Sequence, residues 1–207
     1  MFDKVTTGKN PSSDIVNLPN TVSFIRILMA PVLFVLALNQ QPVWFLGILI
    51  FSEFTDILDG FLARKLHQVT RLGAQLDSWG DFIIYSSTAI CAWILWPETV
   101  KQHPLPISLI IASFTLPVIL GLIKFRTLTS YHTWSVKIAV ATTIIAYLLL
   151  FSGVLDWPIN LAAVACLYAA LEEIFITLII KQERTDIRSI LQAIRYRKQI
   201  NIKNSRY

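Results

Sequence analysis

The chain has 207 residues, of which 55% are hydrophobic, and a formal net charge of +5. Its mean hydropathy is +0.59, and a soluble domain of this size would not contain such long apolar runs. A membrane-spanning helix needs about 20 mostly apolar residues. Six windows meet this requirement, at about 21–39, 42–63, 77–96, 105–123, 134–153 and 157–180. The sequence therefore predicts an all-α integral membrane protein with six transmembrane helices.

The six windows leave little chain for anything else. Residues 1–20 are polar and lack the charged start, apolar middle and small-residue cleavage site of a signal peptide. The first window is therefore predicted to be a retained helix. Residues 21–180 would form one six-helix domain, followed by a basic tail at 181–207. Cys91 and Cys166 fall inside predicted spans and are interpreted as small apolar side chains.

The distribution of lysine and arginine predicts the orientation of the helices. With six spans both termini share one side, and every Lys and Arg except Lys101 can be placed there. Because Lys and Arg concentrate in cytoplasmic loops, both termini are predicted to be cytoplasmic. We expect a multi-pass protein of a bacterial inner membrane.

The tail, KQERTDIRSILQAIRYRKQINIKNSRY, permits two interpretations. It can be a solvated basic helix that enforces topology and lies near anionic lipid headgroups, at about 1 kcal/mol per basic residue near the surface. It can also be an arm that binds nucleic acid or a partner. Basic tails are common on membrane proteins, so we favour the first interpretation and expect no nucleic-acid partner.

Four aspartates stand out against this apolar background. Asp56 and Asp59 are three residues apart and Asp77 and Asp81 are four apart, so each pair shares one helix face. The connection at 65–72 is short, so the second and third helices are predicted to be antiparallel neighbours that bring the pairs together. Clustered carboxylates repel in a low dielectric unless they take up protons or bind a cation. Oxygen ligands of this kind suit Mg²⁺, Mn²⁺ or Ca²⁺ better than zinc.

The neighbouring residues indicate phosphoryl-transfer chemistry. Two divalent ions about 4 Å apart can clamp the attacking and leaving oxygens of a displacement at phosphorus. The small residues Gly60, Ala63 and Gly73 would let a bulky ligand approach the backbone, and Arg64 offers a planar fork for a phosphate. Each feature alone also fits a proton relay, an ion site or simple helix packing. The combination favours a nucleotide or polyphosphate substrate.

The segment from Asp56 to Asp81 resembles the signature of the CDP-alcohol phosphotransferases, D-x2-D-G-x2-A-R-x8-G-x3-D-x3-D. All fixed positions are matched without a gap: Asp56, Asp59, Gly60, Ala63, Arg64, Gly73, Asp77 and Asp81. Six helices with cytoplasmic termini are also typical of that family.

The resemblance implies a role for each matched residue. The four aspartates would hold a pair of Mg²⁺ or Mn²⁺ ions against the pyrophosphate of a CDP-linked donor. Asp81 would also be the general base that deprotonates the acceptor hydroxyl. The CDP pocket would be formed by Asp56, Gly60, Ala63, Arg64 and Gly73. The resemblance further implies CDP-diacylglycerol as donor, release of CMP, an active site that faces the cytoplasm, and a homodimer.

The acceptor alcohol is less well defined. The stretch NLPNTVSFIRILMAP, from Asn17 to Pro31, resembles the N-terminal stretch of phosphatidylglycerophosphate synthases and favours glycerol 3-phosphate. That branch usually has Pro and Lys where this chain has Ser78 and Phe82. Inositol phosphate, inositol, serine and choline therefore stay open as acceptors.

Several charged residues outside the signature are further candidates. An acceptor phosphate would need a cationic site, for which Lys124, Arg126 and Lys137 are candidates, although the same residues also fit the cytoplasmic bias of basic side chains. His132 is interpreted as an ordinary loop histidine. Intramembrane acids are functional candidates by default. Glu53 could orient a metal ligand or line the path of the acceptor. Glu172 and Glu173 can equally form ion pairs with Arg or Lys of another helix.

A divalent-cation transporter is the competing prediction from another class. It would place carboxylates near the centres of the spans and would not need Arg64 or Gly60. The aspartates instead lie towards the predicted cytoplasmic ends, which favours an enzyme. A non-catalytic scaffold would not need the complete set of four aspartates.

Overall fold

The computed structural model describes residues 18–65, 71–127, 131, 133–180, 187, 189–195 and 197. The described chain is helical, which confirms the predicted all-α class. The helices are α1 (Leu18–Leu38), α2 (Pro42–Lys65), α3 (Arg71–Leu95), α4 (Pro97–Gln102), α5 (Pro104–Phe125), α6 (Trp134–Phe151) and α7 (Pro158–Ile179). Residues 190–195 add a short helical segment.

Four helices in the described part of the chain are long and apolar enough to cross a membrane. They are Thr21–Leu38 of α1, Pro104–Phe125, Trp134–Phe151 and Pro158–Ile179. By length alone, α2 and α3 would also cross a hydrocarbon core of about 30 Å. They carry the four aspartates and do not meet the same criterion of apolar composition. The six spans and the cytoplasmic termini stay predictions.

Proline marks the start of four helices. Pro42, Pro97, Pro104 and Pro158 are the first residues of α2, α4, α5 and α7. Proline suits this position because its fixed φ is already helical and its missing N–H would have no partner inside the helix. The short helix α4 was not predicted, because its six residues are too few to show a periodic apolar pattern.

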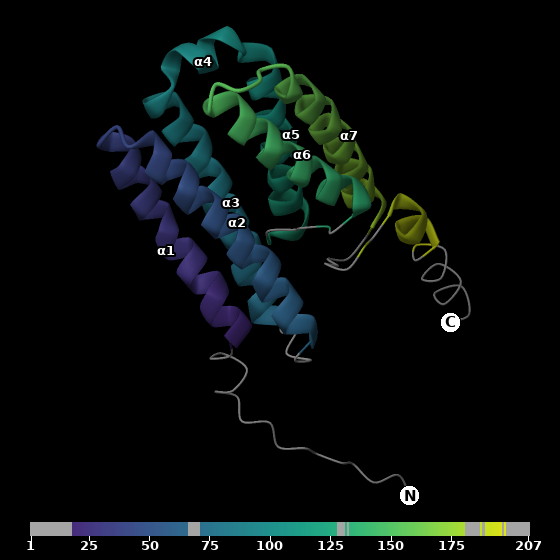
Figure 1. The fold of residues 1–207 in the computed structure, drawn as a ribbon. Coiled ribbons are helices and arrows are strands. Elements are labelled where there is room, and N and C mark those ends of the chain that lie inside the picture. Colours follow the sequence, from purple (N-terminus) through teal and green to yellow (C-terminus); the bar gives the residue numbers. More distant parts are fainter. Residues whose placement is uncertain are drawn as a thin grey trace, which may run out of the picture. The chain divides into compact units, whose positions relative to one another are not determined.

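The chain divides into two compact units, residues 1–91 and 92–207. In the first unit α1 packs along α2 (Figure 1). The packed faces of the two helices bury Leu33, Ala37, Phe45 and Leu49. Other apolar side chains of the same helices, such as Leu28 and Phe51, are more than half exposed. Exposed apolar side chains in this number are expected where lipid replaces water.

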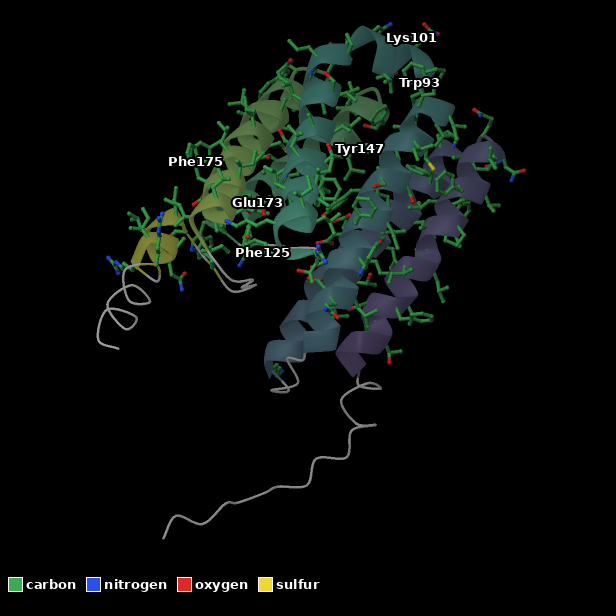
Figure 2. All side chains as sticks on the ribbon, turned by 180° about the vertical axis from the view of Figure 1, so that it is seen from behind. Trp93, Lys101, Phe125, Tyr147, Glu173 and Phe175 are labelled. Carbon is green, nitrogen blue, oxygen red and sulfur yellow. The ribbon has the colours of Figure 1, made fainter. Side chains whose placement is uncertain are left out.

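In the second unit α5 and α6 both pack against α7 (Figure 1). The buried side of α7 is made largely of small residues, namely Ala162, Ala163, Ala169 and Ala170. Small residues let helix backbones approach closely, which is how helices associate in a membrane. Larger apolar side chains point away from the helix, as Figure 2 shows for Phe175, which is 53% exposed.

The described part of the basic tail packs onto the end of α7. Ile187 and Ala193 are buried in a cluster with Tyr131, Ile176 and Ile180. The hydroxyl of Tyr131 also accepts a hydrogen bond from Thr177 at 3.1 Å. The interpretation of the tail as a wholly solvated segment is therefore wrong for these residues, since apolar side chains anchor them to the second unit.

Removal of the cap on α6 should destabilise the second unit. Thr133 is fully buried, and its Oγ1 accepts the backbone N–H of Val136 at 3.3 Å. The near-isosteric change Thr133→Val removes this acceptor, and we expect a loss of about 1 kcal/mol. The readout is the melting temperature of the purified protein in detergent.

Thr142→Val is the matched control for this substitution. The Thr142 hydroxyl donates to the Ile138 carbonyl at 2.8 Å inside α6, where it caps no helix end. We expect this variant to melt at nearly the wild-type temperature. Equal losses for the two variants would contradict the capping role of Thr133.

Candidate active site

Three of the predicted aspartates come together in the first unit. Carboxylate oxygens of Asp56 on α2 and of Asp77 and Asp81 on α3 lie within 4.8 Å of one another. Asp77 and Asp81 are one helical turn apart and so project from the same face of α3. The convergence expected from the spacing is therefore present for these three. The Asp59 side chain lies outside the described residues.

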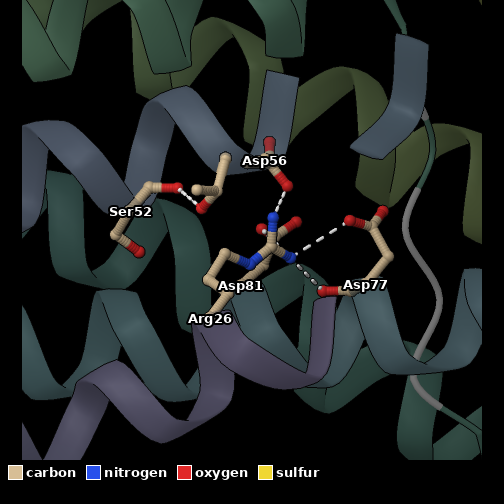
Figure 3. A network of polar contacts seen from close by, with 6 residues as sticks. Arg26, Ser52, Asp56, Asp77 and Asp81 are labelled. Carbon is tan, nitrogen blue, oxygen red and sulfur yellow. Dashed lines mark hydrogen bonds and ion pairs between the residues drawn. The ribbon is translucent and has the colours of Figure 1, made fainter. Parts of the chain in front are cut away.

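A buried arginine lies at the centre of this cluster. Arg26 of α1 forms an ion pair through Nη1 with Oδ1 of Asp56. Its Nη2 lies 3.1 Å from Oδ1 of Asp77 and 3.2 Å from Oδ1 of Asp81. The same nitrogen donates to the backbone carbonyl of Asp77 at 2.9 Å. Figure 3 shows the guanidinium between the three carboxylates, so side chains from three helices meet at one cation.

Gly80 leaves the space in which the guanidinium lies. A Cβ atom at position 80 would lie 2.7 Å from Nη2 and 2.9 Å from Nε of Arg26. Real Cβ atoms essentially never make contacts this short, so any larger residue at 80 would push the guanidinium away. The absence of a side chain at Gly80 therefore allows Arg26 to lie in this position.

The cluster is closed on the arginine side and open on the carboxylate side. The Arg26 side chain is 3% exposed, whereas those of Asp56, Asp77 and Asp81 are 33%, 25% and 26% exposed. The three aspartate side chains are therefore partly accessible to solvent, whereas the guanidinium is not.

The residues of the cluster fit a divalent cation. Carboxylate oxygens are the ligands that Mg²⁺ and Mn²⁺ prefer. The formal charge of the three aspartates exceeds that of Arg26 by two units, the charge of one such ion. The oxygens already surround a positive group, which shows that their geometry suits a cation.

Further polar groups border the cluster. Glu53, one turn before Asp56, is half-buried and interacts electrostatically with Arg26. Tyr85 on α3 lies near Arg26 and Asp81. The predicted place of Glu53 beside a metal-ligand candidate is therefore consistent with the structure.

The CDP-pocket candidates are described only in part. Gly60, Ala63 and Arg64 belong to the last turns of α2, but their side chains lie outside the described residues. Gly73 is half-buried in the first turn of α3. The contribution of these residues to a pocket stays a prediction.

The three cationic candidates for an acceptor phosphate belong to the second unit. The Nζ of Lys124 donates to the backbone carbonyls of Thr177 and Leu178 at 2.8 and 3.1 Å. It thereby satisfies carbonyls at the end of α7, a common role for lysine. Arg126 ends α5 in a left-handed conformation with φ 58° and is exposed. Lys137 is exposed on α6, with its Nζ 5.2 Å from the ring centroid of Trp134.

The two acids of α7 have structural partners. Glu172 accepts the backbone N–H of Ile190 at 3.2 Å through Oε1, and Oε2 accepts the hydroxyl of Ser135. Glu173 accepts a hydrogen bond from the backbone of Tyr131. These bonds connect α7 to the start of α6 and to the tail, a role that the sequence did not indicate. His132 lies outside the described residues.

Sequence reasoning missed the roles of Arg26 and Gly80. A signal was present for Arg26, because a charged residue within an apolar span is a functional candidate by default. The sequence prediction placed Arg26 on the cytoplasmic side, within the stretch that resembles phosphatidylglycerophosphate synthases, and gave it no partner. For Gly80 the sequence held no signal, since the close contact depends on a residue of another helix.

Comparison with known proteins gives relatives that act on different alcohols. The chain is 38% identical to an Aquifex aeolicus CDP-diacylglycerol–glycerol-3-phosphate 3-phosphatidyltransferase over 65 residues, 31% of this chain and 36% of that protein. It is 34% identical to a Candida albicans CDP-diacylglycerol–inositol 3-phosphatidyltransferase over 96 residues, 46% of this chain and 41% of that protein. It is 32% identical to a CMP-forming cardiolipin synthase of Rattus norvegicus over 119 residues, 56% and 38% of the two chains.

These matches cover well under half of each relative, and no solved structure matches the chain significantly. The family model described as CDP-alcohol phosphatidyltransferase matches residues 16–177, most of the chain and the whole aspartate cluster. The chain therefore belongs to the CDP-alcohol phosphatidyltransferase family.

Proposed function

We propose that this protein is a phospholipid-synthesising enzyme that transfers a phosphatidyl group from CDP-diacylglycerol to a polar alcohol and releases CMP. The observation that carries the proposal is the convergence of Asp56, Asp77 and Asp81 on one cation-binding point. In a member of this family, carboxylates at the signature spacing fit metal-dependent chemistry on a pyrophosphate.

The aspartates would bind the metal and receive the proton. Asp56, Asp59, Asp77 and Asp81 would hold one or two Mg²⁺ or Mn²⁺ ions, which when bound neutralise the pyrophosphate and polarise its phosphorus–oxygen bonds. Gly60, Ala63, Arg64 and Gly73 would hold the CDP moiety beside them. A carboxylate oxygen of Asp81 would accept the proton of the acceptor hydroxyl.

The transfer itself exchanges one phosphorus–oxygen bond for another. The acceptor oxygen forms a bond to the phosphorus that bears the diacylglycerol. The bond from that phosphorus to the bridging oxygen breaks, and CMP leaves with the electron pair. The product is a phosphodiester that joins the acceptor to the lipid.

Glycerol 3-phosphate is the acceptor that we favour. The N-terminal stretch supports it, and so does similarity to proteins named for that acceptor. Similarity to inositol phosphatidyltransferases keeps inositol, and by the same chemistry inositol phosphate, as the alternative. Arg126 and Lys137 are exposed cations suited to an acceptor phosphate. Lys124 is the weaker candidate because its ammonium group already bonds to α7.

We further propose six membrane spans, with both termini and the active site on the cytoplasmic side, and a homodimeric assembly. α2 and α3 would be the two additional spans. Their aspartates then lie towards the cytoplasmic ends of the helices, where a water-soluble acceptor can reach them.

Asp81→Asn should abolish catalysis. Asparagine keeps the shape of the side chain but does not accept a proton, so we expect CMP release to fall about 100-fold or more. The assay measures CMP released by the purified protein in detergent with CDP-diacylglycerol, glycerol 3-phosphate and Mg²⁺ or Mn²⁺. A chelator should abolish release by the wild type.

Asp156→Asn makes the same chemical change at an exposed position before α7 and should leave CMP release unchanged. Equal rates for Asp81→Asn and the wild type would exclude Asp81 as the base. Metal-independent release would exclude the proposed metal site.

Lys137→Gln should weaken binding of a phosphorylated acceptor. We expect the KM for glycerol 3-phosphate to rise about tenfold, the effect of losing about 1.4 kcal/mol, with an unchanged KM for CDP-diacylglycerol. The exposed Lys101 gives the matched control Lys101→Gln. An acceptor series with inositol, inositol phosphate, serine and choline identifies the preferred alcohol. If only an unphosphorylated alcohol supports turnover, the assignment of Lys137 fails.

Cysteine labelling tests whether α2 and α3 cross the membrane. In a variant without Cys91 and Cys166, single cysteines are placed at Gln41, just before α2, at Lys65, the last residue of α2, and at Lys101 in α4, which follows α3. An impermeant maleimide added to intact cells should label positions 41 and 101 but not 65. Labelling of all three, or of none, would contradict the six-span topology.

A further inference from the structure

We propose that Arg26 is the built-in counter-cation of the aspartate cluster, and that its guanidinium leaves the cluster when a divalent ion binds. The inference rests on the metal site of the proposed function, because it concerns the group that balances the negative charge of that site before metal binds. Arg26 would thus set the affinity of the site for metal and hold the three helices together without metal.

The position of Arg26 is well defined by its contacts. Its side chain is 3% exposed, and it contacts three carboxylates and one backbone carbonyl. A charge in an apolar surround is costly unless it is paired and hydrogen-bonded. Conversely, three carboxylates this close need a cation or protons. Each side of the cluster therefore stabilises the other.

Arg26 and a metal ion would need carboxylate oxygens of the same three aspartates. Oδ1 of Asp56, Asp77 and Asp81 are the atoms that contact the guanidinium. They are also carboxylate oxygens of the group that is close enough to hold an ion. An ion held at about 2.0–2.6 Å by these oxygens would lie next to the guanidinium, and like charges at such separations repel strongly. A metal ion bound to these carboxylates therefore disfavours the guanidinium of Arg26 there, and the guanidinium disfavours the ion.

The guanidinium of Arg26 is held in the cluster by non-covalent contacts. It belongs to a long flexible side chain, and its place in the cluster depends on the empty space at Gly80. The side chains of the three aspartates are 25–33% exposed. We therefore expect an ion to reach the aspartates from solvent and Arg26 to move away from them.

Metal binding to the full-length purified protein tests the inference without reference to activity. Mn²⁺ affinity is measured in detergent from the loss of the free Mn²⁺ signal in electron paramagnetic resonance. Arg26→Met removes the competing charge, and Gly80→Ala displaces the guanidinium but keeps every charge. We expect both variants to bind Mn²⁺ about tenfold more tightly, or better, than the wild type.

Two controls define where the ion binds and why. Lys101→Met also removes one positive charge, but from an exposed pair with Glu98, and should leave the Mn²⁺ affinity unchanged. Asp77→Asn removes a carboxylate of the cluster and should weaken Mn²⁺ binding, which places the ion there.

Thermal stability gives a second readout. Without metal, Arg26→Met should melt about 5 °C or more below the wild type, because its carboxylates face one another uncompensated. Mn²⁺ should stabilise this variant more than it stabilises the wild type. A merely structural arginine predicts the same loss of stability, but with unchanged or weaker Mn²⁺ binding.

The possible results separate this inference from the proposed function. If the wild type binds Mn²⁺ and both variants bind it no more tightly, the counter-cation role is overturned and the metal site stands. If neither the wild type nor either variant binds Mn²⁺, the metal site and the inference both fail. Should Arg26→Met not fold, Gly80→Ala decides alone.

Discussion

The pairing of Arg26 with three aspartates is the interaction on which the first unit depends. The four charged groups come from three helices whose other buried contacts are apolar or small. Apolar contacts tolerate a shift of one helix along another. A buried guanidinium, in contrast, meets its carboxylate partners at only one position along the helix axis. The ion pairs therefore fix the register and rotation of α1 against α2 and α3. The same constraint places Gly80 beside the guanidinium and brings Asp56 to the level of Asp77 and Asp81.

The second unit is stabilised by different means. Alanines on α7 allow close approach of its neighbours, and hydrogen bonds from Lys124, Ser135 and Ile190 to α7 join the ends of segments. Lys124 donates to backbone carbonyls at the end of α7, and the neutral donors of Ser135 and Ile190 bond to the Glu172 carboxylate. Such contacts define a rigid framework without a concentrated charge. The charged cluster of Arg26 and the three aspartates lies in the unit that carries the signature residues.

The features that the sequence predicted correctly depend on local spacing. The all-α class follows from long apolar runs, and the meeting of Asp56 with Asp77 and Asp81 follows from helical periodicity and a short connection. The features that it missed depend on the rotation of one helix against another. The pairing of Arg26, the contact at Gly80 and the bonds of Lys124 to α7 are of this kind. The distribution of basic residues predicts only the side of the membrane on which Arg26 and Lys124 lie. It does not predict which residues they contact.

The position of α7 in the second unit has a consequence for the order of assembly. Helices enter the membrane in the order of their synthesis and then pack. α5 and α6 are made first, yet the helix that both contact is α7, which is made afterwards. In the order of synthesis, α5 and α6 are therefore complete before the helix against which both pack. The tail is made last, and its Ile187 and Ala193 pack at the end of α7.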